Sequence, residues 1–205
     1  GSGRVATDLI KDLVATGNEV TAGARHPEKV IKLNHVTAVE LNLHDSVEKI
    51  AELMKDMDAV YFVAGSRGKD LLQTDAMGAV KTMQATEKDG IKRYIMLSSL
   101  YALQPEMWPK VPSLASIMDY NIAKFFADNY LISNTNLDYT ILQPANLTEE
   151  PGTGKIQIGE GSATSNPIPD VAQTLADILQ HDNTIGHVIM MRSGDTPIEE
   201  ALDQI

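Results

Sequence analysis

The sequence alternates between short apolar segments typical of strands and segments with apolar residues at helical spacing. Strand patterns lie at residues 19–25, 36–43, 58–64, 93–98, 138–143, 155–158 and 187–192. Helix patterns lie at residues 7–16, 28–32, 45–54, 71–89, 119–132, 170–179 and 197–202. Repeated alternation is typical of a mostly parallel sheet with helices on both faces. We therefore predict one doubly wound α/β domain over residues 1–205, with irregular loops at 101–118 and 145–169. The segment at 58–64 is apolar enough for a buried parallel strand.

The composition argues against several classes of function. A formal net charge of −11 does not suit general nucleic-acid binding or an anionic membrane surface. The absence of cysteine excludes disulfides, thiol catalysis and thiolate metal ligands. The five histidines lie in separate segments, so we expect no metal site. Without a membrane-length apolar run or a signal-peptide pattern, the expected location is cytoplasmic.

A glycine-rich turn precedes the first helix pattern. It reads G-x-G-x-x-A and consists of Gly1, Ser2, Gly3, Arg4, Val5 and Ala6. Glycine permits a tight turn and close approach of the main chain to a pyrophosphate, and a small last residue lets the helix pack closely on the sheet. A turn of this kind follows a strand, so we expect a strand before Gly1. The alternative is a frayed terminus or a cloning remnant, because a lone glycine motif is a weak signal.

Arg25 and His26 end the first strand pattern, with Arg25 lying 22 residues after Gly3. In a dinucleotide-binding fold this position meets the adenosine ribose, where an acid favours NAD and an arginine can pair with the 2′-phosphate of NADP. The sequence therefore favours NADP(H) over NAD(H). Asn42, Leu43, His44 and Asp45 lie at the end of the next strand pattern and are predicted to lie at the adenine edge. The alternative for Arg25 is an ordinary solvated surface arginine.

Tyr120 and Lys124 lie four residues apart in a helix pattern, which places both side chains on one helix face. A nearby ammonium favours phenolate and lowers the pKa of a tyrosine from about 10, as a proton donor to a carbonyl requires. Ser98 and Ser99 end a strand pattern, where a hydroxyl can bind a substrate carbonyl and stabilise an alkoxide. Each motif alone also fits a chance match or an ordinary strand end.

Taken in chain order, these motifs resemble the short-chain dehydrogenase/reductase superfamily, and most closely its compact atypical group of NAD(P)H-binding or NAD-dependent epimerase/dehydratase-like proteins. The resemblance covers essentially the whole chain and includes three further segments, Val63–Ser66, Leu137–Ala145 and Asp170–Ala172. It implies a Rossmann fold, a bound nicotinamide dinucleotide and a catalytic set of Ser99, Tyr120 and Lys124. The further cofactor-binding residues that it implies are Ala64, Gly65, Ser66, Lys124 and Pro144.

The chain departs from the family pattern in two places. The family turn is usually G-x-x-G-x-x-G, so Gly1 is either the first glycine of the shorter motif or a middle residue of the longer one. Gln143-Pro144-Ala145 stands where the family usually has Arg-Pro-Gly, which leaves no basis for expecting an anionic substrate.

The expected activity is that of an NADP(H)-dependent oxidoreductase that transfers a hydride to or from a small carbonyl substrate. Two alternatives stay open. One is an epimerase or dehydratase that uses the same residues through a keto intermediate, and the other is a non-catalytic NADP(H)-binding sensor with a protein partner. The substrate pocket is expected between the loops at 101–118 and 145–169, with Tyr101, Met107, Trp108 and Leu147 as wall residues. A monomer and a homodimer fit the sequence equally well.

Overall fold

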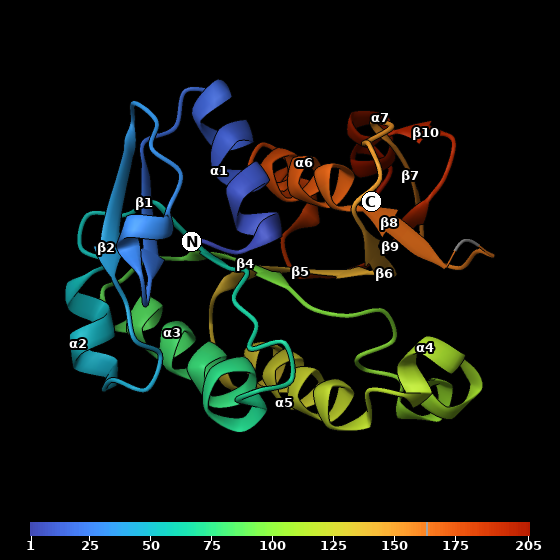
Figure 1. The fold of residues 1–205 in the computed structure, drawn as a ribbon, viewed down its shortest axis with the longest axis horizontal. Coiled ribbons are helices and arrows are strands. Elements are labelled where there is room, and N and C mark those ends of the chain that lie inside the picture. Colours follow the sequence, from blue (N-terminus) through green and yellow to red (C-terminus); the bar gives the residue numbers. More distant parts are fainter. Residues whose placement is uncertain (163) are drawn as a thin grey trace.

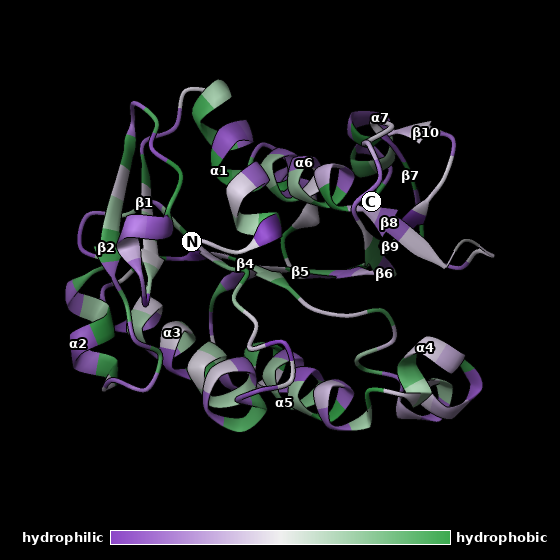
Figure 2. Cartoon of the chain, viewed as in Figure 1, coloured by the Kyte–Doolittle hydropathy of each residue, from purple (hydrophilic) through white to green (hydrophobic). Residues whose placement is uncertain are grey.

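The structure is a layered arrangement in which helices cover both faces of a central sheet (Figure 1). It is a computed structural model that describes residues 1–162 and 164–205. One face carries α1 (Arg4–Ala15), α6 (Ile168–Ile178) and α7 (Ile198–Asp203). The other face carries α2 (Val47–Glu52), α3 (Met77–Lys88) and α5 (Met118–Asn134). Hydrophobic and hydrophilic residues alternate along these helices (Figure 2), as expected for helices that bury one side.

The main sheet has six strands in the order β10–β7–β9–β5–β4–β3. The bounds are β3 (Ala59–Phe62), β4 (Arg93–Leu97), β5 (Asp138–Pro144), β7 (Lys155–Ile158), β9 (His187–Ser193) and β10 (Thr196–Pro197). Strands β3, β4, β5 and β9 are parallel to one another. Strand β7 pairs antiparallel with β9, and β10 pairs antiparallel with β7. The predicted doubly wound, mostly parallel architecture is confirmed. Because β3, β4 and β5 run in one direction, the loops that follow them meet at the same edge of the sheet.

Strands β1 (Val20–Ala24) and β2 (Val36–Glu40) form a separate two-stranded parallel ladder. Among the described residues, no strand pairing joins this ladder to β3. Three of the four β3 residues are therefore half-buried, whereas the apolar pattern predicts a fully buried strand. The expectation of a strand before Gly1 stays a prediction.

Two predicted helices differ in type from the observed ones. Residues Pro27–Lys29 form one turn of 3₁₀ helix, η1, because Val30 already has extended backbone and its side chain is buried against β1. The helix predicted at 71–89 begins as a π-helix, η2 (Leu71–Ala76), and continues as α3. π-Helical turns are rare and often occur at functional sites.

The irregular regions contain short elements only. The loop at 101–118 holds η3 (Pro105–Lys110) and α4 (Pro112–Ala115), as predicted, and η4 (Asp182–Thr184) precedes β9. The sequence did not indicate β6 (Asn146–Thr148) and β8 (Ser165–Pro167), which form a parallel pair. Each has only three residues in a Gly- and Pro-rich segment, so neither carries a readable alternation.

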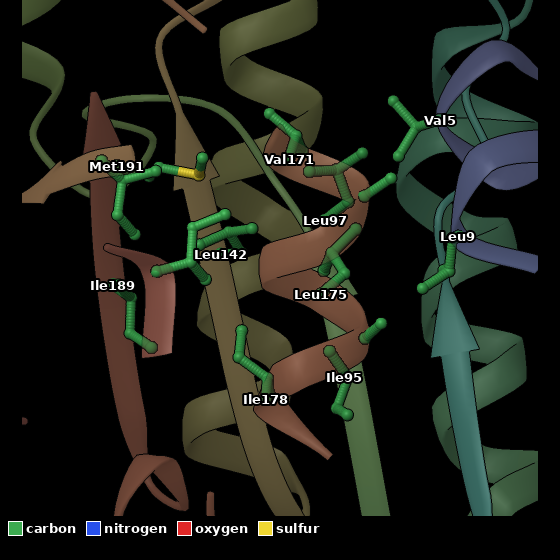
Figure 3. Close-up of a cluster of buried hydrophobic side chains, with 14 of the residues drawn as sticks. Val5, Leu9, Ile95, Leu97, Leu142, Val171, Leu175, Ile178, Ile189 and Met191 are labelled. Carbon is green, nitrogen blue, oxygen red and sulfur yellow. The ribbon is translucent and has the colours of Figure 1, made fainter. Parts of the chain in front are cut away.

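The largest core cluster joins α1 and α6 to the middle of the sheet (Figure 3). Val5 and Leu9 of α1 pack with Val171 and Leu175 of α6. The sheet residues beneath them are Ile95, Leu97, Leu142, Ile189 and Met191. Each large aliphatic side chain buried here stabilises the fold by about 1.5–3 kcal/mol. This packing holds α1, and with it the glycine turn, in a fixed position on the sheet.

Candidate cofactor and active site

The glycine turn lies directly at the N-terminus of α1. Gly3 has extended backbone just before the first helical residue, and no side chain caps the first helical turn. A Cβ atom at Gly1 would lie 2.9 Å from the Ala22 Cβ atom, so only glycine fits there. A Cβ atom at Gly3 would meet nothing within 4 Å. The first turn of α1 thus has no side-chain cap and open space beside Gly3, as an anion-binding helix N-terminus requires.

An open pocket of about 530 Å³ lies in front of this turn. Ser2, Gly3 and Arg4 line it from the turn, and Arg67 lines it from the loop after β3. The Arg4 guanidinium forms an ion pair with the Glu149 carboxylate across the pocket. The remaining lining residues are Thr7, Asp8, Glu150, Pro151, Ile168 and Pro169.

The side chain of Val5 takes no part in the predicted cofactor site, because it is buried in the core beneath α1. Only its backbone amide, in the first turn of α1, is placed to contact a ligand. The helix starts at Arg4 rather than Thr7, which turns Val5 toward the sheet.

A second open pocket, of about 390 Å³, lies at the ends of β1 and β2. Its lining residues are Arg25, His26, Glu40, Asn42 and His44. The structure thus brings together four predicted residues from the ends of two strands. The side chain of Leu43 does not join them, because it is buried in the core that includes α3. Residues 43 and 44 form a turn in which the Asp45 amide donates to the Asn42 carbonyl oxygen at 3.0 Å, and this turn leaves Asn42 and His44 at the pocket while Leu43 is buried.

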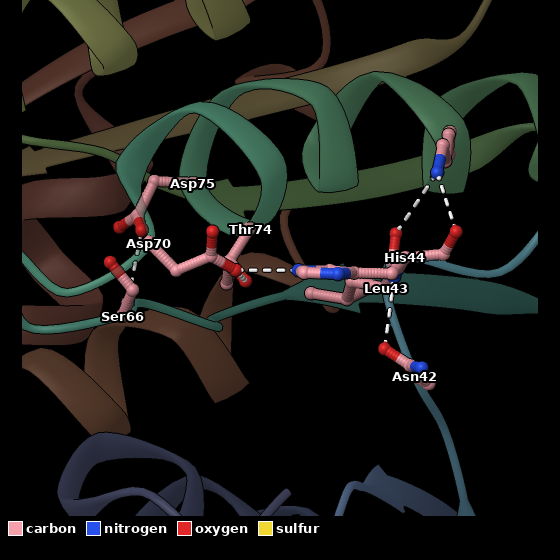
Figure 4. A network of polar contacts seen from close by, with 8 residues as sticks. Asn42, Leu43, His44, Ser66, Asp70, Thr74 and Asp75 are labelled. Atoms are coloured by element: carbon pink, nitrogen blue, oxygen red, sulfur yellow. Dashed lines mark hydrogen bonds and ion pairs between the residues drawn. The ribbon is translucent and has the colours of Figure 1, made fainter.

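His44, which the sequence places with Asn42 at the adenine edge, connects this pocket to η2 (Figure 4). Its Nε2 atom lies 2.6 Å from Oδ2 of Asp70, and the Thr74 hydroxyl donates to the same oxygen at 2.6 Å. These contacts, with the hydrogen bond from Thr74 as the largest, lower the pKa of Asp70, and the charge of Arg25 adds to the effect. The pocket therefore combines an arginine and two imidazoles with a carboxylate at its side.

The loop after β3 is anchored by a buried acid on the π-helix. Asp75 is fully buried, and its Oδ2 atom accepts a hydrogen bond from the Ser66 amide at 3.0 Å (Figure 4). The Ser66 hydroxyl and Asp75 Oδ1 are buried without a hydrogen-bond partner in the described part of the chain. Gly65 is exposed and Ala64 is half-buried beside them. Buried polar atoms without a partner are uncommon in folded proteins. The family-based cofactor contacts at residues 64–66 stay a prediction.

Within the predicted catalytic set, Lys124 is held in place by burial and by a hydrogen bond to the main chain. It is 3% exposed, and its ammonium donates to the Leu97 carbonyl oxygen at 3.2 Å, at the end of β4. The same ammonium lies 5.6 Å from the centre of the Tyr120 ring, one helical turn earlier. Ser99 is buried two residues after Leu97. The structure thus brings the Tyr–Lys pair to the strand end that carries the serines.

Ser98 and Ser99 are both buried at the end of β4. The Ser98 hydroxyl points into the protein and donates to Asp128 Oδ2 at 2.8 Å. Pro144 is the predicted cofactor contact at the end of β5. Its carbonyl oxygen accepts a hydrogen bond from the Leu100 amide at 2.9 Å. This hydrogen bond therefore joins the segments at the ends of β4 and β5, beside the candidate reaction site.

The predicted pocket-wall residues belong mainly to a small cluster beside this site. Tyr101 has a left-handed backbone, with a φ of 57°, and its hydroxyl donates to Glu160 and accepts from Arg192. The Trp108 indole donates to the Tyr101 carbonyl oxygen at 2.8 Å, and Met107 packs against the same cluster. Leu147 instead packs, half-buried, against the core of α1 and α6.

A protein-family model described as NAD(P)H-binding matches residues 1–182. The chain belongs to the NAD(P)H-binding family. The crystal structure of the oxidoreductase ylbE from Lactococcus lactis is 46% identical to this NAD(P)H-binding protein, with a TM-score of 0.96, over 100% of this chain and 93% of that chain. The uncharacterized sugar epimerase YhfK of Bacillus subtilis is 38% identical over 175 residues, which cover 82% of this chain and 78% of that protein.

A short-chain dehydrogenase/reductase from Veillonella parvula, solved in complex with NADP, shows the likeness of fold alone. It is 18% identical, with a TM-score of 0.76, over 95% of this chain and 92% of that chain. The family model and the two more similar relatives confirm the predictions of a Rossmann fold, of an NAD(P)H-binding protein and of the family.

Two further findings concern the part of this NAD(P)H-binding protein that the structure describes. No helix there is long and apolar enough to cross a membrane. No group of three or more histidine, aspartate or glutamate side chains there could hold a metal ion.

Proposed function

We propose that this protein is an NADP(H)-dependent oxidoreductase that moves a hydride to or from the carbonyl carbon of a small substrate. The proposal extends the family membership by naming the reaction, the preferred cofactor and the residues that act. Tyr120, Lys124 and Ser99 are assigned to the chemistry, and Arg25 is assigned to the choice of cofactor.

The position of Lys124 carries the proposal. A buried ammonium needs strong compensation, and here its described partners are one main-chain carbonyl at the end of β4 and the rings of Tyr120 and Phe62, at 5.6 and 5.9 Å. An ammonium held in this way stabilises negative charge on a neighbouring phenolic oxygen. A lysine that served only the fold would extend to the surface, as most lysines do.

The chemistry divides between the cofactor and the chain. When bound, a nicotinamide dinucleotide supplies or accepts the hydride. The Tyr120 hydroxyl gives its proton to the carbonyl oxygen of the substrate during reduction and recovers it during oxidation. The Ser99 hydroxyl donates a hydrogen bond to the same oxygen and orients it. Lys124 stabilises the charge that develops on the Tyr120 oxygen.

The preference for NADP(H) follows from the pocket at the ends of β1 and β2. A 2′-phosphate placed there would meet Arg25, with His26 and His44 on the same pocket wall. Arginine binds phosphate through charge-assisted hydrogen bonds. An acid that selects NAD would lie at the end of β1. The acid among the lining residues is Glu40, which instead ends β2.

Turnover of NADPH tests the proposed reaction. The purified protein is incubated with NADPH and a panel of aldehydes, ketones and quinones, and the near-ultraviolet absorbance of NADPH is followed. Tyr120→Phe should slow the oxidation of NADPH by about 10²- to 10⁴-fold. Tyr130→Phe is the matched control, because the hydroxyl of Tyr130 lies on the same helix but binds the Gln84 side chain. A carbonyl that is reduced equally well by Tyr120→Phe would contradict the assigned role.

An epimerase is the second candidate, because the relative from Bacillus subtilis is named as one. The same tyrosine and lysine would then act twice, once to form a keto intermediate and once to reduce it. An epimerase leaves the concentration of NADPH unchanged, so product analysis on sugar substrates without net oxidation separates the two. Unequal affinity for NADP⁺ and NADPH without any turnover would instead support the non-catalytic sensor.

A further inference from the structure

A buried carboxylate lies directly behind the candidate catalytic residues. Asp128 follows Lys124 by four residues on α5, as Lys124 follows Tyr120, so the three side chains share one helix face. Its side chain is fully buried. Oδ2 of Asp128 accepts hydrogen bonds from the Ser98 hydroxyl at 2.8 Å and from the Gln143 amide at 2.9 Å. One carboxylate therefore joins α5 to the ends of β4 and β5.

The second oxygen of this carboxylate is not satisfied. Oδ1 of Asp128 is buried and has no hydrogen-bond partner within the described residues. Both donors to Oδ2 are neutral groups, and Gln143 stands where the family pattern usually has arginine. Burial raises the pKa of Asp128 to about 6, against the opposing effects of Ser98, Gln143 and the charge of Lys124. A carboxyl group at the centre of the site thus changes its charge in weakly acidic solution.

Lys124 is the charged group that acts on Asp128. The elements around α5 also carry these titratable residues: Asp75 on η2, Lys81, Glu87 and Lys88 on α3, Arg93 and Tyr94 on β4, and Asp138 and Tyr139 on β5. The pKa of Asp128 responds to its burial, to its two hydrogen bonds and to Lys124. Asp75 binds the Ser66 amide, and Lys81 donates to the carbonyl oxygens of Leu43 and His44, so both have other partners.

We propose that Asp128 is a positioning residue that holds the serine-bearing end of β4 through Ser98 and sets the electrostatic field at Lys124. In its charged form it attracts the Ser98 hydroxyl and offsets the ammonium charge. When Asp128 is protonated and neutral, the Lys124 ammonium loses that compensation. The electrostatic potential at Tyr120 then becomes more positive. This role rests on the proposed function of Tyr120 and Lys124, but the first test needs neither a substrate nor turnover.

The test follows the ¹³Cε resonance of Lys124 by NMR between pH 4.5 and 8 in protein labelled with ¹³C-lysine. Assignment comes from the signal that disappears in Lys124→Arg. The wild-type resonance should shift with an inflection near pH 6, where Asp128 titrates. Asp128→Asn keeps the shape of the side chain and an acceptor for Ser98, but it should remove the inflection. Ser98→Ala removes a hydrogen bond to the charged form and should move the inflection up by about one pH unit.

Asp12→Asn is the matched control. The pKa of Asp12 is also raised to about 6, but Asp12 lies on α1 and is affected by Asp8 and Asp177 rather than by the α5 residues. This variant should leave the Lys124 titration unchanged. An inflection that is absent in the wild type, that survives in Asp128→Asn or that disappears in Asp12→Asn overturns the proposal. If Asp128→Asn does not fold, an inflection that stays in place in Ser98→Ala overturns it as well.

Activity then separates this proposal from the proposed function. If a carbonyl substrate is found, the plot of kcat/KM against pH should bend near pH 6, and Asp128→Asn should remove that bend while Asp12→Asn keeps it. If no carbonyl is turned over but the Lys124 inflection behaves as described, the proposed reaction fails and the electrostatic link between Asp128 and Lys124 stands. If turnover depends on Tyr120 but the Lys124 resonance shows no inflection, the proposed reaction stands and the proposed role of Asp128 fails.

Discussion

The two ends of the candidate dinucleotide site are built in different ways. At the α5 end, Lys124 and Asp128 are almost wholly buried, and their partners are fixed main-chain and side-chain groups. At the β1–β2 end, Arg25 and His26 are exposed around an open pocket. The first end resembles a protein interior, and the second resembles a solvated surface.

This difference determines what each end can do. Charges in a buried, low-dielectric environment interact strongly and do not need to reorganise, which suits the stabilisation of charge during a reaction. Exposed charges are screened by water and salt, so they contribute modest binding energy that depends on the ligand's own charge. We therefore expect the α5 end to control the rate and the β1–β2 end to control the choice of cofactor.

The largest effect is expected for Tyr120→Phe at the buried end. Loss of the proton donor should lower kcat/KM for a reduced carbonyl by about 10²- to 10⁴-fold. The dissociation constant for NADPH should stay unchanged, because the hydroxyl acts on the substrate. Intrinsic fluorescence or calorimetry measures the binding. A loss of NADPH affinity as large as the loss of rate would show that the two ends are not separate.

Asp128→Asn should show the buried character of this end through the pH dependence of stability. Because the folded pKa of Asp128 is about 6 and the ordinary value is 3.8, the folded state holds its proton more tightly than the unfolded state. The wild type therefore loses stability as the pH rises from about 4 to 6. Relative to Asp128→Asn, its free energy of unfolding should fall by about 2.4 kcal/mol between pH 4 and pH 8. Urea unfolding at both pH values measures this difference.

Asp12→Asn gives the comparison for a half-exposed carboxylate. The folded pKa of Asp12 is also about 6, so the sign of the effect is the same. Water screens the partly exposed side chain, and the change in relative stability between pH 4 and pH 8 should be clearly smaller than for Asp128→Asn. Equal changes in both variants would mean that burial does not distinguish the two sites.

A smaller and more selective effect is expected for Arg25→Ala at the exposed end. Removing a charge-assisted contact to the 2′-phosphate should weaken NADPH binding by about 10- to 100-fold. NADH binding should change by less than about twofold, since NADH has no such phosphate and Arg25 is solvated in its absence. Lys32→Ala, which removes an exposed cation outside the pocket, is the control. Equal losses for both cofactors would refute the assignment.

The smallest effect is expected for Glu149→Gln, which breaks the exposed ion pair with Arg4. Stability should change by about 0–1 kcal/mol, as for most surface ion pairs. NADPH should bind a few-fold more tightly, because Arg4 no longer has to leave Glu149 to meet the pyrophosphate. Glu150→Gln removes the same charge from the same pocket without affecting the pair, and it should have the weaker effect on affinity.

Local patterns predicted the parts of the site that lie close together in sequence. The Tyr120–Lys124 spacing predicts a shared helix face, and the structure places both at the end of β4. The glycine turn predicts a helix start, and α1 begins at Arg4. The separation of Leu43 from Asn42 and His44 was not predictable in this way, because residues 43 and 44 form a turn where the pattern over 36–43 predicts a strand.

Partners that lie far apart in sequence could not be predicted in this way. His44 and Asp70 are 26 residues apart, and Ser98 and Asp128 are 30 apart. Neither pair leaves a local pattern, because a turn of π-helix and the packing of α5 on the sheet decide the contact. The same holds for Asp75, which reads as an ordinary acid near a helix start.

By itself, the sequence determined the order of strands and helices, the family and the candidate ligand-binding residues, because periodicity, turn glycines and i, i+4 spacing act over a few residues. Only the tertiary structure decided which of those residues are buried, which acids serve them and where two open pockets form. The physical reason is that burial sets the strength of an electrostatic interaction, and burial is a property of the packed sheet and helices rather than of any short segment.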